Sequence, residues 1–361
     1  MTATRHYLLA AGGTGGHMLP AYALAGELIA RGHRVALVSD DRGLRIPGAP
    51  AELETHVLPA GRVQGGPVGW VKAALAIRKG RAMAIDLIRD FDPAVVVGFG
   101  GYPSLPSLLA ARATKTPSVI HEQNAVLGRT NRLMAGRVDA IAVAYHHIRR
   151  FPPACADKRH LIGNPVREEI IAIREDGYPP LPEDGIVRLL VVGGSLGATV
   201  LSDVVPAAVA MLPRALLDRL QVVQQCRETD IETVRAKYAA LGVAAECAPY
   251  ITDFPERLRW AHLVIARAGA STVAELACAG RPAVFVPYPH AMDDHQTYNV
   301  GDLVAAGGAI SIQQSDFNPA ALAKHIQRMA LEPGALEEAA DRAARCGLPD
   351  ANRDLADLVE S

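Results

Sequence analysis

Short apolar runs alternate with amphipathic stretches along the first 145 residues of the chain. Residues 20–31 and 105–113 are amphipathic stretches in which apolar positions recur at helical spacing. The apolar runs predict strands at residues 6–11, 34–38, 55–59, 94–98, 117–120 and 140–143. Strands that are apolar along nearly their whole length are typical of a parallel sheet covered by helices on both faces. This part of the chain is therefore predicted to be a doubly wound α/β domain.

A second series of the same kind follows a proline-rich loop at residues 177–185. It predicts strands at residues 188–192, 221–225, 244–247, 263–266, 283–286 and 309–312. The halves also resemble each other, because residues 8–14 (LLAAGGT) align with residues 189–195 (LLVVGGS). We expect two doubly wound parallel-sheet domains, residues 1–163 and 164–340, facing across a cleft that binds ligands at the carboxyl ends of the strands. A helix within residues 341–361 is expected to pack back towards the first domain.

Composition narrows the class of protein. The 361 residues include 37 Lys and Arg against 38 Asp and Glu, so binding to nucleic acid by overall charge is not expected. The five cysteines are scattered and contain no C-x-x-C pair, which indicates a reduced, cytoplasmic protein without a zinc site. We see no signal peptide and no apolar stretch of about 18 residues, so any membrane contact is expected to be peripheral.

A glycine-rich motif, GGTGGH at residues 12–17, opens the first helix. It does not fit the dinucleotide fingerprint G-x-G-x-x-G, because Met18 stands at the third glycine position; Asp40 keeps that alternative open. What remains is an anion-binding loop around Thr14 at a helix N-terminus. His17 would lie in the first turn, where the helix dipole favours the neutral imidazole of a general base. The alternative is that His17 donates a hydrogen bond to an anion or caps the turn.

Four polar residues, HEQN at residues 121–124, follow the fifth predicted strand. A polar cluster at the end of a strand lines a binding site more often than it fills a core, although a solvated loop would look the same. Glu122 is therefore a second candidate for the catalytic base.

The clearest phosphate-site candidate is the turn at residues 265–275, where an apolar strand passes through small residues into a helix. The free N–H groups of that turn and the helix dipole would stabilise a diphosphate. Glu275 lies one turn into the helix, where its carboxylate could accept hydrogen bonds from two vicinal hydroxyls. The alternative is a capping box, because Thr272 and Glu275 fit S/T-x-x-E.

Two motifs resemble metal sites but are not interpreted as such. Asp90 and Asp92 form a D-x-D sequence before a predicted strand, at the edge away from the expected cleft, and read as a solvated turn. Residues 290–295 (HAMDDH) would place their ligands on a loop and a helix start. We therefore expect no metal cofactor.

Residues 70–81 mix apolar and basic positions at helical spacing. One interpretation is an ordinary amphipathic helix with a solvated basic face. The other is a shallow membrane patch in which apolar side chains enter the bilayer and basic side chains meet anionic headgroups. The patch would consist of Trp70, Val71 and Leu75 with Lys72, Arg78, Lys79 and Arg81.

Six motifs together resemble the N-acetylglucosaminyltransferases of peptidoglycan synthesis. They are GGTGGH, HEQN, GNPVR, GGSxGA, RAGASTVAE and DDHQTxN, and they span nearly the whole chain in this order. The resemblance implies the GT-B fold and an inverting, metal-independent transfer of N-acetylglucosamine from UDP-N-acetylglucosamine. The implied acceptor is muramoyl-pentapeptide on undecaprenyl diphosphate (lipid I), at the cytoplasmic face of the cell membrane and its anionic lipids. The implied product, lipid II, serves cell wall synthesis, cell shape and division.

The resemblance also implies the donor-binding residues. They are Thr14, Gly15, Gly16, Asn124, Arg167, Ser195, Ile251, Ala270, Ser271, Thr272, Val273, Ala274, Glu275 and Gln296. Arg167 and Ser195 would face the donor phosphates, and Glu275 would hold the ribose. Leu196 departs from the family, which usually has glutamine there. Two alternatives remain: a related enzyme of the same fold, such as an epimerase of the sugar nucleotide or a glycolipid synthase, and a non-catalytic nucleotide-sugar sensor.

Overall fold

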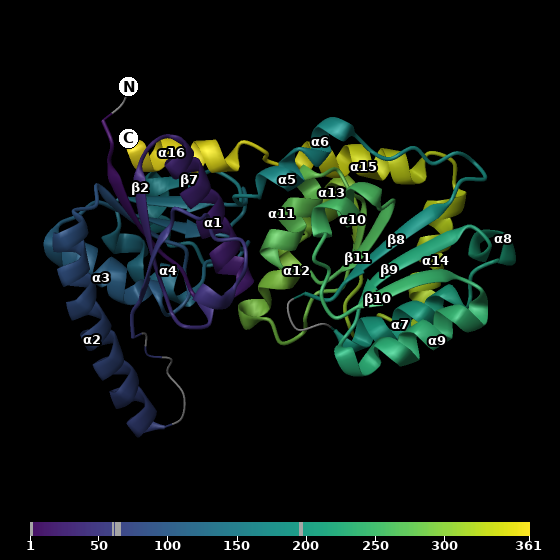
Figure 1. Cartoon of the computed structure of the whole chain (residues 1–361), viewed down its shortest axis with the longest axis horizontal. Coiled ribbons are helices and arrows are strands. Elements are labelled where there is room, and N and C mark those ends of the chain that lie inside the picture. The colour runs from purple at the N-terminus through teal and green to yellow at the C-terminus, as the bar shows by residue number, and fades with distance from the viewer. Residues whose placement is uncertain (1–2, 60, 62–65, 195–197) are drawn as a thin grey trace. The chain divides into compact units, whose positions relative to one another are not determined.

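The computed structural model describes residues 3–59, 61, 66–194 and 198–361, and it divides the chain into two compact units. Unit 1 consists of Met1–Arg167 and Leu348–Ser361, and unit 2 is Glu168–Gly347. Each unit is built on its own parallel β-sheet (Figure 1). Unit 1 is therefore discontinuous in sequence, because its last helix follows the whole of unit 2.

The sheet of unit 1 has the strand order β3-β2-β1-β4-β5-β6-β7. All neighbouring strands run parallel. The strands are β1 (His6–Ala10), β2 (Arg34–Ser39), β3 (Glu54–Val57), β4 (Val95–Gly98), β5 (Ser118–Glu122), β6 (Ala140–Val143) and β7 (Arg159–Leu161). The six predicted strands are confirmed, and β7 is an additional edge strand. Strands β1 to β3 are added towards one edge of the sheet, and β4 to β7 are added towards the other. The order therefore reverses between β1 and β4, and α/β sheets of this kind bind ligands at that point.

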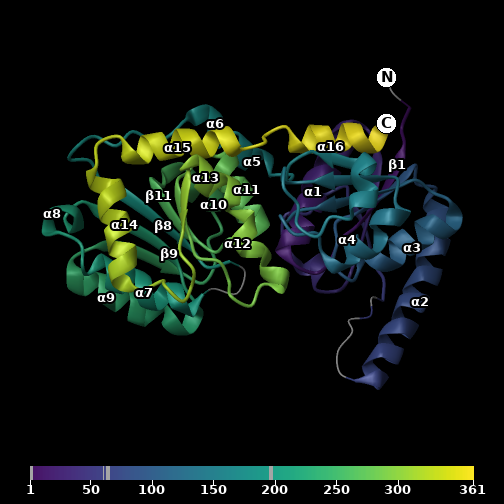
Figure 2. The same ribbon diagram turned by 180° about the vertical axis from the view of Figure 1, so that it is seen from behind.

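Helices cover both faces of this sheet. They are α1 (Gly15–Ala30), α2 (Pro67–Phe91), α3 (Ser104–Thr114), α4 (Arg129–Met134) and α16 (Ala351–Glu360). Apolar side chains of α1 and α16 share one core with Tyr7 and Leu9, whereas those of α2 and α3 share the opposite core with Leu8. Figure 2 shows α16 lying along the same unit as α1. Helix α1 begins at Gly15, which confirms that the glycine motif opens the helix, and the amphipathic stretch from residue 20 lies inside it.

A polar network fastens α16 to unit 1. Arg31, at the end of α1, contacts the carboxylates of Glu27, Asp357 and Glu360. The second oxygen of Glu360 lies 2.5 Å from Nε2 of His33. Burial raises the pKa of Glu360, but hydrogen bonds from His33 and Arg31 outweigh it and bring this pKa below its ordinary value.

The sheet of unit 2 has the order β10-β9-β8-β11-β12-β13, again entirely parallel. Its strands are β8 (Val187–Val192), β9 (Leu220–Gln225), β10 (Ala244–Ala248), β11 (Leu263–Ala266), β12 (Ala283–Phe285) and β13 (Ala309–Ser311). The first strand of each unit therefore occupies the same place in its sheet. This confirms the internal repeat that aligns residues 8–14 with residues 189–195.

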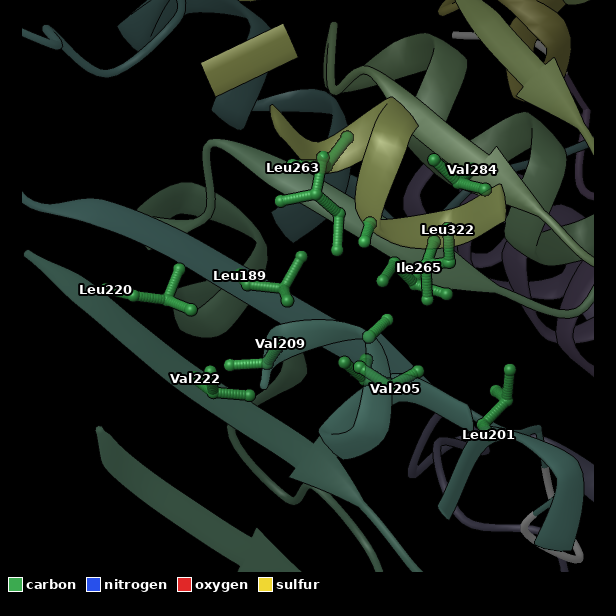
Figure 3. Close-up of a cluster of buried hydrophobic side chains, with 14 of the residues drawn as sticks. Leu189, Leu201, Val205, Val209, Leu220, Val222, Leu263, Ile265, Val284 and Leu322 are labelled. Carbon is green, nitrogen blue, oxygen red and sulfur yellow. The ribbon is translucent and has the colours of Figure 1, made fainter. Parts of the chain in front are cut away.

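The helices of unit 2 form layers around this sheet. They are α5 (Glu168–Ile171), α6 (Ile173–Asp176), α7 (Thr199–Val209), α8 (Arg214–Leu217), α9 (Ile231–Leu241), α10 (Phe254–Trp260), α11 (Ala270–Cys278), α12 (His295–Asn299), α13 (Gly301–Ala306), α14 (Pro319–Leu331) and α15 (Ala335–Cys346). One core joins Leu189 and Ile265 of the sheet with Leu201 and Val205 of α7 and Leu322 of α14 (Figure 3).

A buried arginine, Arg281, ties several segments of unit 2 together. Its side chain is 1 % exposed, and burial lowers its pKa to about 10, so it stays charged at neutral pH. It donates hydrogen bonds to the backbone oxygens of Gly177, Leu258, Arg259, Ala279 and Gly280. Its guanidinium also lies 5.8 Å from the ring centre of Tyr178.

Candidate active site

The glycine loop of unit 1 lies at the carboxyl end of β1 and leads directly into α1. Thr14 is the N-cap residue, with extended backbone angles and an exposed side chain that does not cap the helix. A Cβ atom built on Gly15 or Gly16 would meet nothing within 4 Å, so the first turn is open on that side. The first N–H groups of a helix have no intrahelical acceptor and attract anions. The first turn of α1 therefore leaves room for an anion, and the anion cradle stays a prediction.

His17 is the third residue of α1 and is half-buried. Its imidazole faces the loop after β4, where Gly100 and Gly101 have φ angles of +85° and +74°. A Cβ on Gly100 would lie 3.4 Å from Cε1 of His17, and one on Gly101 would lie 3.4 Å from Cδ2. The two glycine loops thus meet around the imidazole at the point where the strand order reverses.

Glu122, the second candidate base, is 2 % exposed and fully engaged in hydrogen bonds. One carboxylate oxygen accepts from the backbone N–H and the side-chain amide of Asn124, at 3.0 and 3.2 Å. The other accepts from the N–H of Gly128 at 2.7 Å and from Nδ2 of Asn131 at 2.9 Å. A carboxylate has about four lone-pair sites, so these contacts use all of them. These contacts make Glu122 the anchor of its loop.

Gln123 contacts His17, and His121 contacts Gln123; the HEQN motif alone did not distinguish either residue from its neighbours. Nδ1 of His17 lies 3.1 Å from Oε1 of Gln123, and Nε2 of Gln123 lies 3.0 Å from Nδ1 of His121. Successive side chains of a strand alternate between its faces, so His121 and Glu122, the last two residues of β5, point to opposite faces of the sheet. This alternation was the signal in the sequence that could have separated His121 from Glu122.

In unit 2, α11 begins at Ala270 with Gly269 as its N-cap residue. Thr272 is consequently the third residue of the helix and Glu275 the sixth. A capping box requires threonine at the N-cap and glutamate three residues later, so the capping-box alternative is wrong. Glu275 is buried in the second turn.

The first turn of α11 has the features of a phosphate site. The first hydrogen bond into the helix runs from the N–H of Val273 to the oxygen of Gly269, which leaves the N–H groups of Ala270, Ser271 and Thr272 without an intrahelical acceptor. Oγ of Ser271 is buried and has no hydrogen-bond partner among the described residues. Val273 is buried and Ala274 half-buried on the same helix.

A buried glutamine connects two other candidate segments of unit 2. Oε1 of Gln225 accepts from the N–H of Gly193 in the loop after β8, at 3.2 Å. Its Nε2 donates to the backbone oxygen of Pro249 at 3.2 Å, two residues before Ile251. Gln225 thereby links the loop after β8 to the segment that contains Ile251, a predicted donor-binding residue. Ser195 and Leu196, which belong to that loop, lie outside the described residues.

The remaining candidate residues are Gln296, Arg167 and Asn124, and each lies on a different segment of the chain. Oε1 of Gln296, on α12, accepts from the N–H of Tyr288 at 2.9 Å. Arg167 is half-buried and is the last residue of the first segment of unit 1. Asn124 donates to Glu122 and thus belongs to the loop that Glu122 anchors.

The two motifs that resemble metal sites have ordinary surroundings. Asp90 and Asp92 are exposed at the end of α2, and Asp92 ends the helix in the left-handed conformation. His295 bonds through Nδ1 to the backbone oxygen of Met292. Within residues 3–59, 61, 66–194 and 198–361, no group of three His, Cys, Asp or Glu side chains is placed to hold a metal ion.

Helix α2 carries exposed apolar side chains on the part that extends away from the sheet of unit 1 (Figure 1). Trp70 is 67 % exposed, Leu75 is 60 % exposed and Val71 is 59 % exposed. The basic residues Lys72, Arg78, Lys79 and Arg81 are exposed on the same helix. No helix in the described part of the chain is long and apolar enough to cross a bilayer.

Two doubly wound sheets, each with a glycine loop and a helix N-terminus at its point of reversal, define the GT-B class of glycosyltransferases. Models of the N-terminal and C-terminal domains of glycosyltransferase family 28 match residues 7–143 and 188–355. The chain belongs to glycosyltransferase family 28.

Relatives with similar sequences carry one name, UDP-N-acetylglucosamine--N-acetylmuramyl-(pentapeptide) pyrophosphoryl-undecaprenol N-acetylglucosamine transferase. The protein from Sphingopyxis alaskensis is 85 % identical over 361 residues, covering 100 % of this chain and 92 % of the relative. The one from Zymomonas mobilis is 58 % identical over 360 residues, covering 100 % and 93 %. The crystal structure of Acinetobacter baumannii MurG is 31 % identical, covers 99 % of each chain and has a TM-score of 0.79.

Proposed function

We propose that the protein transfers N-acetylglucosamine from UDP-N-acetylglucosamine to the muramoyl-pentapeptide of lipid I, giving lipid II for peptidoglycan synthesis. The observation that carries this proposal is the 85 % identity, over the whole of this chain, to a relative named for that transfer. Membership of glycosyltransferase family 28 agrees with the reaction class.

The donor binds to unit 2 in this proposal. The free N–H groups of the first turn of α11 and the unpartnered Oγ of Ser271 are suited to a diphosphate. Glu275, which does not cap its helix, receives the ribose hydroxyls, as the resemblance to the family implies. The backbone of Ile251 meets uracil, and Gln296 and Asn124 reach the sugar. Arg167 and Ser195 face the phosphates, as the resemblance to the family implies.

His17 takes the proton of the acceptor hydroxyl. The hydroxyl oxygen attacks the anomeric carbon from the side opposite UDP, so that the configuration inverts. Glu122 is the weaker candidate, because its four hydrogen bonds leave no lone pair for a substrate. The charge that develops on the departing diphosphate is stabilised by N–H groups and Arg167, which are oriented before the reaction, and no metal ion takes part.

The protein acts as a peripheral protein at the cytoplasmic face of the cell membrane, where its lipid-linked acceptor resides. Trp70, Val71 and Leu75 enter the anionic lipid surface, and Lys72, Arg78 and Lys79 contact its headgroups. The exposure of these apolar side chains on one helix supports this assignment.

The deciding experiment measures UDP release from UDP-N-acetylglucosamine in EDTA, with and without a short-chain lipid I analogue. Release that requires the analogue and is insensitive to EDTA is the expected result. UDP release or sugar isomerisation without the analogue would instead indicate an epimerase or a hydrolase. Donor binding without any turnover would indicate a nucleotide-sugar sensor.

A further inference from the structure

A continuous chain of hydrogen bonds in unit 1 ends at His17. Nε2 of His121 lies 2.8 Å from the backbone oxygen of Gly163. Nδ1 of His121 lies 3.0 Å from Nε2 of Gln123, and Oε1 of Gln123 lies 3.1 Å from Nδ1 of His17. His121 and Gln123 are 0 % and 1 % exposed, so bulk water does not compete for these contacts.

The direction of the first bond is set by Gly163. A carbonyl oxygen can only accept, so His121 must carry a proton on Nε2. Burial lowers the pKa of His121 to about 4, although the bond to Gly163 opposes this effect, and the ring is therefore neutral at physiological pH. A neutral ring with a proton on Nε2 has a lone pair on Nδ1. That lone pair accepts from the amide group of Gln123.

The orientation of the Gln123 amide follows from the same contacts. Its nitrogen faces the lone pair on Nδ1 of His121, and it also lies 3.3 Å from the backbone oxygen of His121. Both neighbours are acceptors, so the NH2 group must point towards them. The carbonyl oxygen of Gln123 consequently points to His17, where it can only accept a proton from Nδ1. A neutral His17 then has its lone pair on Nε2.

We propose that Gln123, held by His121, is a positioning residue that keeps His17 in the Nδ1–H tautomer, so that Nε2 is the proton acceptor in catalysis. This inference rests on the proposed transfer. As the acceptor oxygen bonds to the anomeric carbon and the bond to UDP breaks, the hydroxyl proton moves to Nε2 of His17. The carbonyl of Gln123 stabilises the resulting imidazolium through Nδ1–H, as an orienting acceptor does for other catalytic histidines.

Two substitutions of Gln123 distinguish the effect of its hydrogen-bond acceptor from the effect of its side-chain volume. Gln123→Met keeps the length of the side chain and removes its hydrogen bonds to His17 and to His121. Gln123→Glu keeps an oxygen that can accept from Nδ1–H of His17. Gln224→Met is the matched control, because Gln224 is also a buried glutamine, bonded to Tyr238 and to the backbone of Leu201 in unit 2.

The direct readout is the tautomer of His17, from long-range ¹H–¹⁵N NMR spectra of the full chain labelled with ¹⁵N-histidine. The His17 signals are identified by their loss in His17→Ala. We expect the Nδ1–H pattern in the unsubstituted protein, in Gln123→Glu and in Gln224→Met, and a shift towards Nε2–H in Gln123→Met. An Nε2–H pattern in the unsubstituted protein, or an unchanged pattern in Gln123→Met, would overturn the proposal.

Kinetics with UDP-N-acetylglucosamine and the lipid I analogue give the second readout. We expect Gln123→Met to lower kcat on the order of tenfold and to change the donor KM by less than about twofold, because the loss concerns proton transfer and not donor binding. Gln123→Glu should recover part of kcat, and Gln224→Met should keep it. A changed tautomer with unchanged kcat would overturn the positioning role. The expected tautomers in a protein that transfers no sugar to the analogue would refute the proposed function and leave the hydrogen-bond assignment intact.

Discussion

The carboxylate of Glu360, the last residue of α16, lies 2.5 Å from Nε2 of His33, the residue before β2. The pKa of Glu360 is lowered in the folded chain, so its ionised form contributes stability above the pKa of the unfolded chain, and this contribution disappears as the pH falls through the folded pKa. We expect Glu360→Gln to lower the Tm of unit 1 at pH 7. The difference from the unsubstituted protein should shrink as the pH falls towards the folded pKa of Glu360. Thermal unfolding followed by circular dichroism from pH 3 to pH 8 measures it, and a difference that is constant over this range would contradict the assignment.

Removing the imidazole of His17 should affect turnover far more than donor binding. General-base catalysis contributes about 10²- to 10⁴-fold, so we expect His17→Ala to lower kcat within that range. The affinity for UDP should remain close to that of the unsubstituted protein in calorimetric titration. His147→Ala, which removes an exposed histidine of the same unit, is the control. A kcat near normal in His17→Ala would eliminate His17 as the base.

Glu275→Gln removes a charge and keeps the shape of the side chain. Hydrogen bonds to a charged group contribute about 1.5–3 kcal/mol, so the loss of ribose contacts should weaken UDP binding by about tenfold or more. Glu256→Gln, on the exposed side of α10, should bind UDP normally. Unchanged UDP affinity in Glu275→Gln, with a lower Tm, would mean that the carboxylate serves the fold and not the nucleotide.

The substitution Arg281→Met should strongly destabilise unit 2. It would leave five backbone oxygens without their donor in a buried place, and we expect the free energy of unfolding to fall by about 3 kcal/mol or more. Arg345→Met is the control, because Arg345 forms an exposed ion pair with Asp341 that contributes little. Urea unfolding of both variants measures the difference, and equal midpoints would show that the network around Arg281 is not stabilising.

The double substitution Trp70→Ser and Leu75→Ser should reduce binding to vesicles that contain anionic phospholipid. Each large apolar side chain contributes about 1.5–3 kcal/mol when fully buried, so even partial insertion predicts a loss of about tenfold or more. Met211→Ser removes a side chain of similar exposure from unit 2 and should bind like the unsubstituted protein. Co-sedimentation measures the bound fraction. Equal binding of all three proteins would show that α2 is an ordinary solvated helix.

The sequence predicted the fold well because most strands are buried on both faces and therefore read as apolar runs. Strand β7 was missed for the opposite reason. All three of its residues, Arg159–Leu161, have exposed side chains, so its place at the edge of the sheet leaves no apolar pattern. Periodicity alone indicates α1 only from residue 20, because Gly15 and Gly16 at its start carry no hydrophobic signal, and the glycine motif supplied the true start.

The site was predicted less completely. The glycine motif correctly placed His17 in the first turn of a helix, but periodicity cannot say which groups surround a side chain. Glu122 and Gln123 are neighbours in one polar motif, yet one anchors a loop and the other contacts His17. The capping-box alternative failed because α11 begins at Ala270, two residues before Thr272. The sequence does not reveal this start, because the residues on both sides of Gly269 are small.

The discontinuity of unit 1 has a consequence for biogenesis. Leu355, Ala356 and Val359 of α16 complete the core beside α1, yet they are translated after the whole of unit 2. The strands of unit 1 are therefore synthesised long before α16, the helix that covers part of their sheet. Until residue 348 and those after it emerge, the nascent chain carries a complete unit 2 together with an apolar surface of unit 1 that is exposed to chaperones and to other nascent chains. We therefore expect unit 1, whose strands are synthesised first, to finish folding last.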